Sequence, residues 1–157
     1  MPKVEIVKRP DGKALKKKQE RLNFSSKSKV KVGFPEGGGE YPDGTPVVTV
    51  AVWNEFGIET DTHTQYERPF FRLAMLDNRA KYRKMNKSFA KKILDGKITI
   101  EQALGLLGEE AVADIIDSIN ELSDPANEPS TIAKKGSSNP LVDTKLMGQS
   151  VRAEVVK

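Results

Sequence analysis

The single histidine of this chain, His63, is the first candidate for acid-base chemistry. His63 follows Asp61 in the polar stretch at 59–65, and a histidine beside an aspartate can serve as the general base of a hydrolase. That chemistry also needs a nucleophile, but no serine lies in a recognisable nucleophile elbow and cysteine is absent. We therefore interpret His63 as a surface residue and expect no enzyme. A small hydrolase using His63 and Asp61 is the third hypothesis.

Metal and phosphate chemistry lack the residue patterns that they need. One histidine and scattered carboxylates do not provide convergent metal ligands. The glycines at 37–39 resemble a phosphate loop only in composition, because no Lys-Ser or Lys-Thr pair follows and Glu36 and Glu40 would repel phosphate. The pair Glu109 and Glu110 is typical of a solvated helix face. We expect no cofactor and no metal.

Basic residues near the N-terminus could contact nucleic acid. The candidate residues are Lys13, Lys16, Lys17, Lys18 and Arg21. Such a run can follow phosphates without reading bases, and the lack of interleaved aromatic residues argues against stacking on single strands. A basic accessory protein that binds nucleic acid through residues 1–31 is the second hypothesis.

Composition limits the class of protein. A chain of 157 residues with 37% hydrophobic and 31% charged residues fits one polar domain with arms or loops outside its core. No apolar run approaches the roughly 20 residues of a membrane helix, and the N-terminus has no apolar signal-peptide segment. We expect a soluble chain with a basic arm and short helix at 1–27 and a single domain at 28–157.

Charge is segregated along the chain. Residues 1–31 and 67–97 are strongly basic, whereas residues 32–66 and 98–129 contain acidic residues and no lysine or arginine. Such blocks can place opposite potentials on different faces and so favour oriented association with a second copy. The alternative is that the blocks neutralise one another within the monomer.

Two strands and one helix are expected around the acidic loop at 35–44. Alternation of apolar residues predicts a strand at 28–34 and a final strand at 151–155, which we expect to pair. The β-branched residues of 45–57 favour a strand, but Thr45 before Pro46 is a typical helix start and Gly57 a typical helix end. We predict a helix at 46–56.

The second half of the chain predicts two long helices. An apolar stripe begins after Pro69 and contains one polar member, Asn78, while Thr99 with Gln102 forms a capping box that opens the next helix. The fold expected is α+β: a small antiparallel sheet packed against a long antiparallel helix pair. An extended N-terminal arm, a short basic helix within 13–24 and a flexible loop at 123–140 complete it.

Three motifs in order carry a resemblance to a known family. They are Val-Gly-Phe at 32–34, Asn-Glu-Phe-Gly at 54–57 followed by Arg-Pro-Phe-Phe at 68–71, and the segment at 135–151 that contains Pro-Leu-Val-Asp-Thr. Together they resemble the tail-completion, or virion morphogenesis, proteins of tailed bacteriophages over roughly residues 29–156. The family usually has Gly after Asp-Thr, and Lys145 stands there in this chain, which leaves a tight turn at that point open.

The resemblance implies a structural subunit of the virion and no catalytic residue. It implies a ring, typically of six copies, at the neck between the tail and the portal, with the tail tube or tail terminator and the connector proteins as partners, nonspecific contact with packaged DNA, and host cytoplasm as the place of assembly. The implied assembly positions are Asn54, Glu55, Phe56, Gly57, Arg68, Pro69, Phe70, Phe71, Pro140, Leu141, Asp143, Thr144, Leu146 and Ser150. We also expect Glu55 either to pair with Arg68 or to be solvated separately from it, and the two alternatives are weighed equally.

Overall fold

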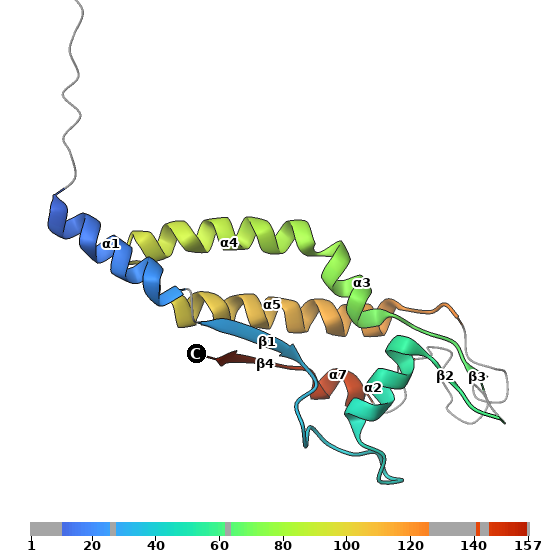
Figure 1. Cartoon of the computed structure of the whole chain (residues 1–157). Coiled ribbons are helices and arrows are strands. Elements are labelled where there is room, and N and C mark those ends of the chain that lie inside the picture. The colour runs from blue at the N-terminus through green and yellow to red at the C-terminus, as the bar shows by residue number, and fades with distance from the viewer. Residues whose placement is uncertain (1–10, 26–27, 62–63, 126–140, 142–144, 157) are drawn as a thin grey trace, which may run out of the picture.

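The longest helix, α5 (Ile100–Glu121), is the element on which the other elements pack (Figure 1). The computed structural model describes residues 11–25, 28–61, 64–125, 141 and 145–156. A two-stranded antiparallel sheet of β1 (Lys29–Gly33) and β4 (Arg152–Val156) lies on one side of α5, and α4 (Arg79–Leu94) lies on the other. The expected α+β class is confirmed. In the part of the chain that is described, no helix is long and apolar enough to span a membrane.

The sheet contacts α5 at an unusually short distance. β1 and β4 pair over their full lengths, which confirms the predicted pairing, and Val32 lies opposite Ala153. At Gly108 of α5, an added Cβ would lie 2.7 Å from Ala153 Cβ and 2.8 Å from Val30 Cγ2. Real Cβ atoms do not approach so closely, so only glycine lets this helix and this sheet pack together.

The predicted helix at 46–56 is confirmed as α2 (Val47–Phe56). Its N-cap is Pro46, without a side-chain hydrogen bond, so the expected cap by Thr45 is wrong. Val47 and Ala51 are buried in the core. Burial of this face stabilises the helix despite its β-branched residues, because packing outweighs local propensity.

The single helix expected after Pro69 is in fact two helices. α3 (Phe70–Asp77) ends and α4 begins at Asn78, whose side-chain amide donates to Ala74 O (3.0 Å), the same carbonyl that accepts its backbone N–H (3.2 Å). Such local side-chain bonds compete with the regular helix ladder. The expected pair of two continuous helices is therefore not found in that form, and α4 has no fully buried residue.

Polar contacts join α4 to α5. The Nζ of Lys81 forms ion pairs with Asp114 and, at 3.0 Å, with Glu110 Oε1. The hydroxyl of Tyr82 donates to Asp114 Oδ2 (2.7 Å). Burial, then the hydrogen bond to Asp114 and the charges of Asp114 and Glu110, raise the pKa of Tyr82 well above its ordinary value. The first turn of α5 has the predicted capping box.

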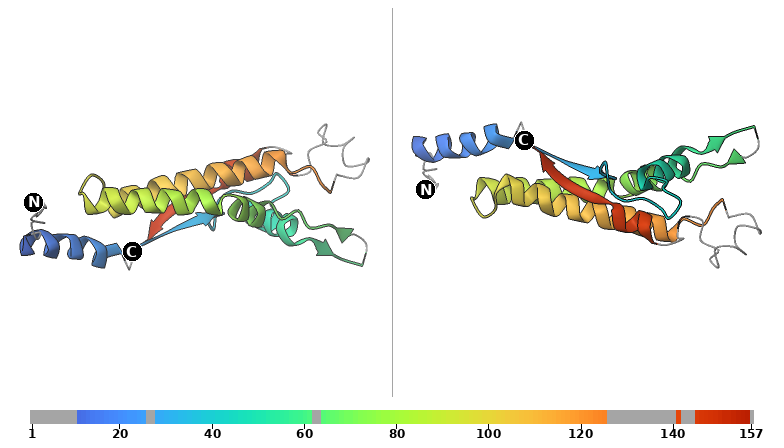
Figure 2. Two further views of the ribbon diagram at one scale, coloured as in Figure 1. Left: turned by 90° about the horizontal axis from the view of Figure 1, so that it is seen from above. Right: turned by 90° about the horizontal axis from the view of Figure 1, so that it is seen from below.

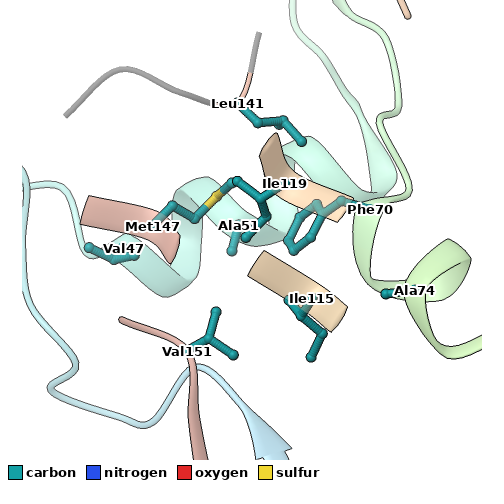
Figure 3. Packing of buried hydrophobic residues seen from close by; sticks show 9 residues of the cluster. All are labelled: Val47, Ala51, Phe70, Ala74, Ile115, Ile119, Leu141, Met147 and Val151. Atoms are coloured by element: carbon teal, nitrogen blue, oxygen red, sulfur yellow. The ribbon is translucent and has the colours of Figure 1, made fainter. Parts of the chain in front are cut away.

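The apolar core lies at one end of the molecule, where α2, α3, the C-terminal half of α5 and α7 (Leu146–Ser150) meet (Figure 3). Its members are Val47, Ala51, Phe70, Ala74, Ile115, Ile119, Leu141, Met147 and Val151. The ring of Phe70 meets Phe34 edge to face, with centroids 6.1 Å apart. The first aromatic residue of the Arg-Pro-Phe-Phe motif is thus a centre of the core.

The two ends of the molecule differ in how they are built (Figure 2). α1 (Gly12–Ser25), which confirms the predicted basic helix, contacts α4 far from the core. A short hairpin of β2 (Ile58–Glu59) and β3 (Thr64–Gln65) extends beyond α2 at the opposite end, and it was not predicted from the sequence. The expected arm and the flexible loop lie mostly outside the described residues, and the division into an arm and one domain stays a prediction.

Candidate assembly surface

The last turn of α2 places its polar side chains inside and its aromatic side chains outside. Asn54 and Glu55 are only 7% and 6% exposed, whereas Trp53 and Phe56 are 37% and 64% exposed. This is the reverse of the usual distribution, in which carboxylates face water and large apolar groups are covered. The inward and outward sides of this turn therefore need separate explanations.

The inward carboxylate of Glu55 caps the N-terminus of α3. Its Oε2 accepts the N–H of Phe71 (2.9 Å) and its Oε1 accepts the N–H of Arg72 (3.1 Å). The N-cap residue of α3 is Pro69, which has no side-chain acceptor, so the first N–H groups of this helix need an acceptor from elsewhere in the chain. A negative charge at a helix N-terminus also interacts favourably with the helix dipole.

Arg72 completes this cap, which corrects the expected pairing of Glu55 with Arg68. The Nε of Arg72 donates to Glu55 Oε1 (2.8 Å), and its Nη2 donates to Glu55 O (2.8 Å) and Glu67 Oε2 (3.0 Å). Its guanidinium lies 5.3 Å from the ring centroid of Phe56. Arg72 directly follows Arg-Pro-Phe-Phe but was not among the expected assembly positions, because its partner Glu55 is seventeen positions away in the chain.

Arg68 and Asn54 hold the two halves of the motif together through other bonds. The N–H of Arg68 donates to Asn54 O (2.6 Å), and its side chain is buried with Nε donating to Pro125 O (2.9 Å). Asn54 Nδ2 donates to Val50 O (2.9 Å), and its Oδ1 accepts from Gln65 Nε2 (2.8 Å). Each of these two buried side chains therefore has hydrogen-bond partners, as burial requires.

Gly57 permits the chain to reverse at the end of α2. Its φ is 72°, and an added Cβ would lie 2.9 Å from Gln65 O and 3.1 Å from Glu67 N. A side chain would both strain the backbone and push the hairpin away. The glycine of the Asn-Glu-Phe-Gly motif thus sets the position of the hairpin beside α2.

The C-terminal motif lies against the same core. Leu141 is buried, Leu146 is half-buried, and the buried hydroxyl of Ser150 donates to Leu146 O (2.8 Å). Lys145 adopts a φ of 61°, in the left-handed region where the resembled family has glycine. Its other expected positions, Pro140, Asp143 and Thr144, lie outside the described residues.

The outward apolar side chains on and beside this helix are grouped under the name α2 surface. It consists of the exposed residues Val48, Val52, Trp53 and Phe56 of α2, with Tyr66 of the hairpin strand end. Val48, Val52 and Phe56 recur every four residues and therefore share one side of the helix. The backbone of Tyr66 packs against Gly57, next to Phe56. Exposed apolar groups gathered in this way are typical of a protein interaction site.

The candidates for chemistry are not gathered in one place. Asp61 is exposed on the hairpin, and His63 lies outside the described residues. Glu109 lies exposed on α5, whereas its neighbour Glu110 pairs with Lys81. Among the residues whose positions are given, no group of three or more histidine or carboxylate side chains could hold a metal ion.

The basic candidates lie on α1. Lys13, Lys16, Lys17 and Lys18 are exposed there, and Arg21 belongs to the same helix. α1 contacts α4, which is also basic. These residues are thus distant from the α2 surface, at the other end of the molecule (Figure 1).

No protein family, curated protein or solved structure matches this chain. The resemblance of the motifs to phage tail-completion proteins therefore stays a prediction, and the geometry of the motif residues is what bears on function.

Proposed function

We propose that this chain is a structural subunit of a tailed bacteriophage that completes the tail at the neck and acts through protein contacts. In this proposal several copies, six by the family resemblance, form a ring between the tail tube or terminator and the head connector. The proposal assigns no catalytic step to the chain.

The observation that supports it best is the inverted burial at the end of α2. Asn54 and Glu55 turn inward and are fully used in holding α2, the hairpin and α3 together. Trp53 and Phe56 are left outside on a firmly held helix. A rigid apolar surface costs free energy in water unless another protein covers it, which is the arrangement expected of an assembly subunit.

Substitution of the α2 surface tests this proposal. Val48→Gln with Val52→Gln removes apolar contact area but keeps good helix formers at exposed positions. We expect unchanged helix content by circular dichroism and loss of ring particles in negative-stain images and light scattering. Leu15→Gln is the matched control, since Leu15 on α1 is 50% exposed and Val52 is 48% exposed; it should leave the rings intact.

Two outcomes would contradict the proposal. One is a wild-type protein that remains monomeric at high concentration even when tail-tube or connector proteins are present. The other is its absence from the neck of mature particles when a labelled antibody is used to locate it.

The exposed lysines of α1 support a second candidate function, contact with nucleic acid. DNA affinity that falls steeply with salt and disappears on deletion of residues 1–22 would favour it. Under the ring proposal, the same deletion leaves assembly through the α2 surface unchanged.

A further inference from the structure

Two exposed rows of opposite charge run along α4 and α5. Residues four apart lie on one side of a helix, and each row has four such positions. The basic row is Arg79, Arg83, Lys87 and Lys91, and the acidic row is Glu109, Ala113, Asp117 and Glu121; all eight residues are exposed. Each row spans thirteen residues, and its first and last members lie about 18 Å apart along the helix at 1.5 Å per residue. The rows are thus equal in length and opposite in charge.

The basic row is not neutralised by α5 within the subunit. Of the described residues of α4, Lys81 alone forms ion pairs with α5. Lys81 is two residues from both Arg79 and Arg83, which places it roughly 160° around the helix from each of these two residues at 3.6 residues per turn. The basic row therefore faces away from the edge at which α4 meets α5.

We propose that the basic row of one copy docks on the acidic row of the next copy. This inference depends on the proposed ring, and it names the side-by-side interface within it. Because the two rows lie on different helices of one subunit, a head-to-tail contact uses each row once, and such contacts close into a ring when the rotation between copies allows it.

The arrangement of charge favours a second copy of the chain, rather than nucleic acid, as the partner of the basic row. A phosphate backbone would pair with the basic row, but the acidic row of the adjacent helix would repel it. A second copy satisfies both rows in one interface. Single exposed ion pairs contribute little, so the rows serve to set orientation and association rate, and their effect weakens with salt.

Charge reversal tests the interface. The basic-row variant is Arg83→Glu with Lys87→Glu, and the acidic-row variant is Glu109→Lys with Asp117→Lys. In each variant alone, the reversed row meets a row of the same charge on the next copy. We therefore expect self-association at low salt to weaken by at least about tenfold. An equimolar mixture restores opposite charges at every contact, and we expect assembly to return to within about threefold of wild type.

A matched control changes the same number of charges elsewhere. Lys16→Glu with Lys17→Glu reverses two exposed lysines of α1, outside both rows, and should leave the association constant close to that of wild type. Analytical ultracentrifugation measures the association, and circular dichroism checks that each variant is folded.

The outcomes separate this interface from the proposed function. If the charge-reversed variants form rings as well as the wild type does, or if the two variants fail to assemble when mixed, the interface is overturned and the ring proposal still stands. A basic-row variant that assembles normally but loses salt-sensitive DNA binding identifies the row as a nucleic-acid surface and overturns the interface. If mature phage particles lack the protein, the proposed function is overturned, while the interface between copies still stands.

Discussion

The carboxylate of Glu55 accepts the backbone N–H of Phe71 at 2.9 Å, although the two residues are sixteen positions apart in the chain. This bond makes the end of α2 the cap of α3. The Asn-Glu-Phe-Gly and Arg-Pro-Phe-Phe motifs are therefore two halves of one structural unit, with the hairpin as the segment between them. The unit fixes the direction of the α2 surface relative to the core.

Loss of the Glu55 carboxylate should destabilise the fold. For Glu55→Ala we expect a decrease of about 2–3 kcal/mol in the free energy of unfolding, because hydrogen bonds to a charged group contribute roughly 1.5–3 kcal/mol and a lost cap costs about 0.5–2 kcal/mol. Glu55→Gln keeps one acceptor and should cost less. Urea denaturation measures both, and Glu36→Ala, at an exposed loop position, is the control. Equal stability of Glu55→Ala and Glu36→Ala would refute the cap.

Two glycines of α5 should respond to alanine with opposite signs. Gly105 has no atom within 4 Å of an added Cβ, so Gly105→Ala should gain roughly 0.5–1 kcal/mol from helix propensity. Gly108→Ala has the same propensity gain but forces the sheet away from the helix, and overpacking of this kind typically costs about 1–3 kcal/mol. Thermal denaturation of the two variants compares them directly. Stabilisation by both substitutions would show that the sheet does not pack on Gly108 so closely.

Lys145→Gly should stabilise the protein. A left-handed backbone costs a non-glycine residue about 1–2 kcal/mol, and part of the gain is lost because glycine is more flexible in the unfolded chain. We expect a net increase of roughly 0.5–1 kcal/mol in the free energy of unfolding. Lys145→Val, with a β-branched side chain at the same φ, should be destabilising. The reverse order in chemical denaturation would contradict the left-handed conformation at this position.

Stability at alkaline pH should depend on Tyr82. Its pKa is raised in the folded protein, so the stabilisation is present below the unfolded pKa near 10 and is lost as the pH rises, because the unfolded state then releases the proton first. Above pH 10 the wild type should lose up to about 1.4 kcal/mol more per pH unit than Tyr82→Phe. Urea denaturation from pH 8 to 11 measures both slopes, and parallel slopes would exclude the linkage.

Much of the fold could be predicted because its signals are local. The alternation of β1 and β4, the capping box at Thr99 and the end of α2 at Gly57 each depend on residues within a few positions of one another. Asn78 was recognised as the one polar residue of the apolar stripe after Pro69. The stripe alone did not show that the Asn78 side-chain amide would divide the expected helix into α3 and α4. Short-range competition of this kind leaves the hydrophobic period almost unchanged.

The sequence by itself determined the α+β class, the positions of α1, α2, α5, β1 and β4 and the segregation of charge, since these follow from residue type and period. Only the tertiary structure decided that Glu55 caps α3 with Arg72, that Gly108 admits the sheet, and that Trp53 and Phe56 face outward. Each of these depends on which atoms meet across long stretches of chain. Hydrogen-bond geometry and excluded volume act only once those stretches are packed together.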